Sequence, residues 1–119
     1  MLNYKIPAIP PSNNQFIGRE NPWEYQKIKK QWAQVIALTC RPRPPKALEK
    51  AEVTIIYHFP DKRRRDPDNY SGKMLLDGLV RAKIIADDNF NCISLSLAAV
   101  FDKGNFTEIH IEEVKEDVQ

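Results

Sequence analysis

Apolar and polar residues alternate along four stretches of the chain, and this pattern predicts four β-strands. The clearest stretch is residues 51–59, where every second side chain from Val53 to Phe59 is apolar and Pro60 ends the run. Similar alternation predicts strands over 2–9, 92–101 and 106–114. The sequence Asp-Lys-Gly-Asn at 102–105 is typical of a hairpin turn between the last two strands, with glycine where a positive φ is needed.

Two further stretches follow the spacing of an amphipathic helix. The first begins with Asn21 as the cap, Pro22 at the first position and Glu24 three residues after the cap, and it ends at the proline-rich 41–45. Its apolar face consists of Tyr25, Ile28, Trp32, Val35 and Ile36. The second helix is predicted over 69–83, with its inward residues drawn from Leu75 or Leu76, Leu79 and Val80.

The resulting order, β-α-β-α-β-β, predicts an α+β fold in which two helices pack on one face of a small mixed sheet. The 119 residues suit one domain spanning 1–119. No apolar run approaches the roughly 18 residues of a transmembrane helix, and residues 1–11 lack the features of a signal peptide. Cys40 and Cys92 lack metal-ligand spacing and are expected to be free thiols, so we predict a cytoplasmic protein without a membrane partner.

Charge is distributed unevenly along the chain. The net charge is +2, but residues 1–107 carry 17 basic and 11 acidic side chains, and five of the last twelve residues are acidic. A moderately basic body suits a polyanionic partner, although charge alone is a weak signal.

The segment Lys62 to Asn69 is the most informative for chemistry. Four consecutive cations, Lys62 to Arg65, run directly into Asp66-Pro67-Asp68. The proline shifts Asp66 toward extended geometry, and in an extended segment residues two apart point to the same side. Two adjacent carboxylates repel each other unless a proton or a cation lies between them, and Mg²⁺ prefers such oxygen ligands.

A second acidic pair, Asp87-Asp88, follows the second predicted helix. A helix that returns along the sheet would bring this pair beside Asp66 and Asp68, and Lys73 would lie close enough to stabilise charge on a phosphate. Each feature also has a simpler explanation. The acidic pairs suit turns, the cations suit a solvated patch, and Lys73 with Asp77 suits a surface ion pair.

Taken together, these motifs resemble the RusA family of Holliday junction resolvases. The resemblance rests on Arg65 to Asn69, Lys73, the run Leu76-Asp77-Gly78-Leu79, Asp87-Asp88 and the opening Pro10-Pro11-Ser12-Asn13-Asn14. It covers nearly the whole chain, with one residue more than the family pattern between Asn69 and Lys73.

The resemblance implies a homodimeric endonuclease, often encoded by phages or prophages, that cuts four-way DNA junctions in recombination and repair. It implies that Asp66, Asp68 and Asp88 bind Mg²⁺, for which Mn²⁺ is a candidate substitute, that Asp87 is a further candidate ligand, and that Lys73 is the essential lysine. The residues implied in DNA binding are Ser12, Asn13, Asn14, Gln15, Lys62, Arg63, Arg64, Arg65 and Asn69. Two alternatives stay open: a DNA-binding module without catalysis, and a metal phosphohydrolase that acts on small substrates.

Overall fold

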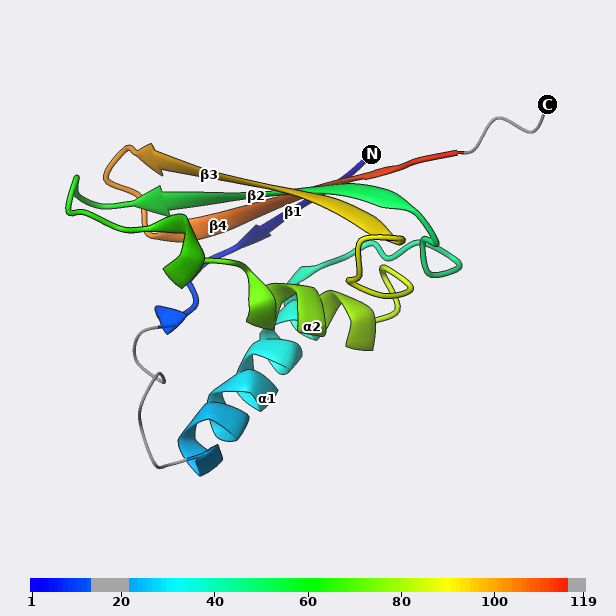
Figure 1. Cartoon of the computed structure of the whole chain (residues 1–119), viewed down its shortest axis with the longest axis horizontal. Coiled ribbons are helices and arrows are strands. Elements are labelled where there is room, and N and C mark those ends of the chain that lie inside the picture. Colours follow the sequence, from blue (N-terminus) through cyan, green and yellow to red (C-terminus); the bar gives the residue numbers. More distant parts are fainter. Residues whose placement is uncertain (14–21, 116–119) are drawn as a thin grey trace.

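The computed structural model describes residues 1–13 and 22–115, and within them the predicted order of strands and helices is confirmed (Figure 1). Both helices lie on one face of a four-stranded mixed sheet, as expected for the α+β class. The elements are β1 (Leu2–Ile6), α1 (Pro22–Thr39), β2 (Ala51–Phe59), a short 3₁₀ turn (Pro67–Asn69), α2 (Lys73–Arg81), β3 (Ile93–Phe101) and β4 (Phe106–Glu113).

The strands lie in the order β1-β4-β2-β3, so that β1 and β3 form the edges. β2 runs parallel to β3, with Val53 opposite Leu95, and antiparallel to β4, with Val53 opposite Ile111. The prediction of a hairpin at 102–105 is therefore wrong, because β2 lies between β3 and β4. The connection instead passes over the end of β2.

The glycine in this connection has a different role from the one predicted. The positive φ, 65°, belongs to Lys103. A Cβ added to Gly104 would lie 2.9 Å from Asp102 Oδ1 and 3.1 Å from His58 Cβ. The glycine is therefore needed for close packing across the end of β2, a tertiary requirement that no turn rule contains.

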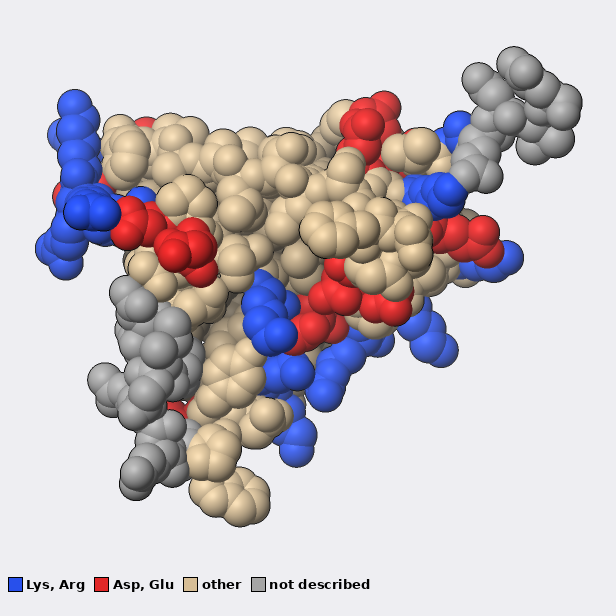
Figure 2. All heavy atoms as spheres, viewed as in Figure 1, with Lys and Arg blue, Asp and Glu red and all other residues tan. Residues whose placement is uncertain are grey.

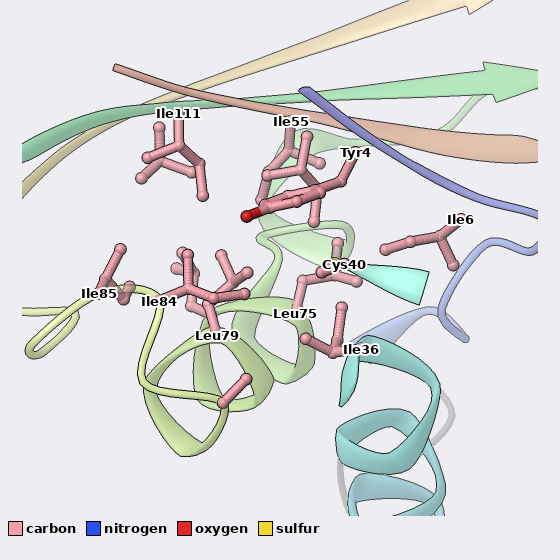
Figure 3. Close-up of a cluster of buried hydrophobic side chains, with 14 of the residues drawn as sticks. Tyr4, Ile6, Ile36, Cys40, Ile55, Leu75, Leu79, Ile84, Ile85 and Ile111 are labelled. Carbon is pink, nitrogen blue, oxygen red and sulfur yellow. The ribbon is translucent and has the colours of Figure 1, made fainter. Parts of the chain in front are cut away.

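The core lies between the sheet and the helices (Figure 3). Ile55 and Ile111 point down from the sheet, Leu75 and Leu79 point up from α2, and all four are fully buried. The predicted inward residues Trp32, Ile36 and Leu76 are also buried, while Val80 is half-buried. The apolar face of each helix was therefore predicted correctly.

The two helices pack directly against each other. A Cβ added to Gly78 of α2 would lie 2.7 Å from Ile36 Cγ1 of α1, so the glycine permits this close approach. Lys29 Nζ of α1 lies 3.4 Å from Asp77 Oδ2 of α2. Asp77 thus pairs with the neighbouring helix, and the suggested pair with Lys73 is not the one that forms.

The predicted element ends shift by a few residues. α2 begins at Lys73 and not at 69, because Pro67–Asn69 forms a 3₁₀ turn and Gly72 adopts a left-handed φ of 79°. The first strand ends at Ile6 instead of residue 9. The predicted cap Asn21 lies outside the described residues.

Both cysteines are free thiols, as predicted. Burial raises the pKa of Cys40 to about 11, so this thiol stays protonated at neutral pH and acts as a core side chain. Within 1–13 and 22–115, no helix has the length and apolar character needed to cross a bilayer.

Candidate functional site

The loop that follows β2 is anchored by Arg65. Its guanidinium lies over the Phe59 ring at 4.2 Å, Nη2 lies 3.0 Å from Asp61 Oδ1, and only 14% of the side chain is exposed. The pKa of Asp61 is lowered, first by the hydrogen bond from the Arg63 backbone N–H and then by Arg65. Arg65 was predicted to contact DNA, but its contacts are those of a residue that holds the loop in shape.

The neighbouring cations project into solvent. The side chains of Arg63 and Arg64 are 78% and 89% exposed, and Lys62 is exposed as well. Arg64 Nε donates to Asp66 Oδ1 at 3.2 Å, an exposed ion pair of a kind that contributes at most about 1 kcal/mol. These side chains are therefore available to a polyanion. Figure 2 shows Lys and Arg atoms beside Asp and Glu atoms at this end of the molecule.

The two aspartates of this loop adopt different backbone conformations. Asp66 is extended, with φ −98° and ψ 138°, as Pro67 predicted. Asp68, however, lies inside the 3₁₀ turn, which Asn69 N closes by donating to Asp66 O at 3.0 Å. Side chains two residues apart share one side only where the backbone is extended, whereas a 3₁₀ turn rotates by about 120° per residue. The prediction that extended geometry aligns the two carboxylates is therefore wrong.

The N-terminal segment packs onto this turn. Asn13 Nδ2 donates to Asp68 O at 3.0 Å and lies 3.1 Å from Ser71 Oγ. A hollow of about 260 Å³ joins the two segments, and its lining consists of Ser12, Arg63, Arg64, Arg65, Asp66, Asn69 and Tyr70. The structure therefore brings together two of the segments that the resemblance implied in DNA binding. Asn14 and Gln15 lie outside the described residues.

A second, smaller hollow, of about 90 Å³, connects this loop to the edge of the sheet. Asp66, Pro67 and Tyr70 line it together with Leu97, Ala98 and Ala99 of β3, among other residues. Asp66 thus lies beside the C-terminal half of the edge strand.

Lys73 is exposed at the start of α2, two residues after Ser71. The position of Lys73 depends on the preceding Gly72, which has a left-handed φ. A Cβ added to Gly72 would also lie 2.5 Å from Ile55 Cδ1. Lys73 therefore begins the helix that leads away from the Asp66–Asp68 turn.

The second acidic pair lies at the opposite end of α2. In Figure 1 the green turn at 66–69 precedes the helix and the yellow turn at 87–91 follows it. Nine helical residues span about 13 Å. Among the residues that the structure describes, no three His, Cys, Asp or Glu side chains form a group that could hold a metal ion. A single chain thus does not place Asp88 beside Asp66 and Asp68.

The two acids of that second turn differ in role. Asp87 Oδ1 accepts from the Asp88 backbone N–H at 2.8 Å, and Oδ2 accepts from Asn89 Nδ2 at 3.3 Å, so Asp87 caps its own turn. The Asp88 side chain is exposed, and its carboxylate accepts no hydrogen bond from the residues that the structure describes. Of the two, Asp88 is the better candidate ligand.

Sequence reasoning missed a cluster of ionisable groups on the outer face of the sheet. His58 Nδ1 lies 2.8 Å from Asp102 Oδ2, and His58 Nε2 and His110 Nε2 each lie 3.4 Å from Glu108 Oε2. The Nε2 contact of His58 is within ion-pair range but lacks hydrogen-bond geometry. The only signal in the sequence was that both histidines fall on the outward positions of their strands.

These contacts shift the pKa values of the cluster. Burial lowers the pKa of His58, but the contacts with Asp102 and Glu108 outweigh it, and the net shift is upward. The pKa of Asp102 is lowered chiefly by His58, and that of Glu108 by His110 and then by His58. The cluster therefore favours a protonated imidazole between ionised carboxylates.

No known family model matches this sequence, and no curated protein is significantly similar to it.

Proposed function

We propose that this protein is a magnesium-dependent, structure-selective endonuclease that cuts four-way DNA junctions as a homodimer, in DNA recombination and repair. The observation that supports it most is the hollow that exposed Arg63 and Arg64 line together with Asp66 and Ser12, with Asp68 in the adjoining 3₁₀ turn. Arginines of this kind hold phosphates without reading base sequence, which suits recognition of DNA shape. The free thiols support a location in the reducing cytoplasm.

The carboxylate oxygens of the candidate ligands are of the chemical type that Mg²⁺ prefers. Asp66 and Asp68 offer hard carboxylate oxygens two residues apart, and Asp88 offers a third that is exposed and uncommitted. A bound Mg²⁺ would supply charge stabilisation at the phosphate and a more acidic water. The role of the exposed Arg63 and Arg64 is to hold the phosphate, and that of Lys73 is to stabilise developing negative charge.

In this proposal the third carboxylate, that of Asp88, comes from a second copy of the chain. The character of the edge strand β3 supports such a dimer. Its nine residues include no charged residue and no proline. Leu95, Val100 and Phe101 are 39%, 37% and 47% exposed, respectively. Soluble proteins usually protect an edge with charges, proline or a bulge, so a bare apolar edge of this length favours pairing with another strand.

Antiparallel pairing of two β3 strands would place the acids of one copy near those of the other. In such a pair the start of one strand meets the C-terminal half of its partner, and opposite residues point to the same face. The turn containing Asp88 leads into β3, and Asp66 lies beside Leu97 to Ala99. Two symmetric sites would result, each with Asp66 and Asp68 from one chain and Asp88 from the other, as paired cleavage requires.

The activity is tested with a labelled synthetic four-way junction, in Mg²⁺ and in chelator. Wild type should nick the junction only with Mg²⁺, and Asp68→Asn should bind it but not cut it, because phosphate contacts supply the affinity. Glu49→Gln, which removes an acid that is 77% exposed at the other end of β2, is the matched control and should cut normally. Normal cutting by Asp68→Asn would refute the assignment.

A mixing experiment tests whether the site is shared. Asp68→Asn and Asp88→Asn chains, each inactive alone, are unfolded together and refolded. Random pairing makes half of the dimers mixed, and one of the two sites in each mixed dimer keeps all its acids, so about a quarter of the wild-type nicking should return. No recovery would exclude a site shared in this way.

The one rival that an observation favours is a DNA-binding module without catalysis, because the described residues of a single chain hold no group of three metal ligands. It predicts junction binding that is unchanged by Asp68→Asn and no nicking by wild type with Mg²⁺ or Mn²⁺.

A further inference from the structure

A second basic surface lies between the helices, on the side of α2 away from the sheet. A hollow of about 390 Å³ is lined by Trp23, Gln26, Lys27, Lys29, Lys30 and Arg81, which we call the α1–α2 groove. Four of its six lining residues are cationic and none is acidic. Figure 2 shows Lys and Arg atoms along the lower side of the molecule, over the helices.

The groove residues of α1 form a stripe along the helix. Trp23, Gln26, Lys27 and Lys30 follow the spacing i, i+3, i+4, i+7, which aligns them on one face. This stripe is distinct from the core face that contains Trp32. Helical geometry thus places one aromatic ring, one amide and two ammonium groups in line over about 10 Å.

The groove also contains an exposed indole, that of Trp23, which binding of phosphates by charge alone would not require. Trp23 is 82% exposed, whereas Trp32, on the inward face of the same helix, is 9% exposed. An indole beside cations provides a face on which an unpaired base can stack while the cations hold its phosphates.

We infer that the α1–α2 groove binds single-stranded nucleic acid, with an unpaired base stacked on Trp23 and the backbone held by Lys27, Lys30 and Arg81. Lys29 is engaged by Asp77 and serves mainly to hold the helices together. A duplex is a poorer ligand because its base faces are already stacked. An anionic membrane is also poorer, because the groove has one large apolar side chain and not the broad apolar face of an interfacial helix.

This binding goes beyond the proposed nuclease function, since it needs neither a metal nor the aspartates. The test is a fluorescence titration with an oligothymidylate of roughly ten nucleotides in chelator. The chain has two tryptophans and one of them is buried, so Trp23 should give most of the quenching. Trp23→Ala should weaken binding at least about five-fold, measured by anisotropy of a labelled strand, while Trp23→Phe keeps most of the affinity.

The charge contribution has its own variant and control. Lys27→Gln with Lys30→Gln should lower the slope of log affinity against log salt by about 1.4, at roughly 0.7 for each phosphate contact. Lys46→Gln, a lysine whose side chain is 87% exposed and lies outside the groove, should leave binding unchanged. Asp68→Asn should also bind normally, which separates this inference from the nuclease assignment.

Three outcomes would overturn the inference. The first is equal affinity for the single strand in wild type and Trp23→Ala. The second is equal affinity for a duplex of the same length. The third is quenching of Trp23 by anionic lipid vesicles but not by the oligonucleotide. Circular dichroism of each variant checks that the exposed substitutions leave the fold intact.

Discussion

Gly72 lies between the Asp66–Asp68 turn and α2, and its replacement by alanine is expected to destabilise the protein in two separable ways. The residue has a φ of 79°, a conformation that residues with a Cβ rarely adopt. The new Cβ would also lie 2.5 Å from Ile55 Cδ1, deep in the core, and 3.6 Å from Tyr57 Oη. Alanine therefore meets both a backbone penalty and a steric clash.

The size of the effect follows from these two terms. The left-handed conformation costs about 1–2 kcal/mol, and overpacking a well-filled core costs about 1–3 kcal/mol. The sum, about 2–5 kcal/mol, is a large fraction of the 5–15 kcal/mol that typical domains possess. Ile55→Val removes the clashing Cδ1 and by itself should cost about 0.5–1.5 kcal/mol.

The assay is urea denaturation followed by circular dichroism, on wild type, Gly72→Ala, Ile55→Val and the double variant. Because the valine relieves only the clash, the double variant should be less destabilised than the sum of the single variants by about 1–3 kcal/mol. The backbone penalty should remain. A Gly72→Ala protein within about 0.5 kcal/mol of wild type, or strictly additive variants, would refute this reasoning.

Three further predictions concern the rest of the molecule. His58→Gln should lower the melting temperature most between about pH 4.5 and 6.5, where the imidazole is protonated, and less as pH rises through the raised pKa of His58. The carboxylates of Asp102 and Glu108, whose pKa values are lowered, remain ionised throughout this window. Thermal melts across pH measure this, and a loss that does not vary with pH would contradict it. Arg64→Gln should reduce the salt slope of junction binding by about 0.9 without loss of stability, whereas Arg65→Gln should lower stability; salt titrations and melts distinguish them. Val100→Lys should shift the protein toward monomer and reduce nicking, measured by sedimentation and junction cleavage, and an unchanged dimer would exclude pairing through this edge.

The sequence by itself determined the elements and the inward face of each. Period-two alternation over 51–59 and helical spacing from Tyr25 to Ile36 predicted where strands and helices occur, because side-chain direction is set by local backbone geometry. Pro67 likewise predicted the extended conformation of Asp66, since the proline ring disfavours the helical region for the residue before it.

Strand order was decided by the tertiary structure. The four-residue link at 102–105 suits a hairpin locally, yet β2 lies between the strands that it joins. Pairing depends on contacts between segments distant in the sequence, such as His58 opposite Phe106, and these are not encoded in the turn.

The same distinction applies to the candidate site. The sequence supplied the residue types: a cationic run, two acidic pairs and a lysine. Only the fold decided that Arg65 packs on Phe59 while Arg64 faces solvent, and that the described residues of one chain form no group of three metal ligands. Chemical type is a property of each residue, whereas exposure and proximity depend on how distant segments pack.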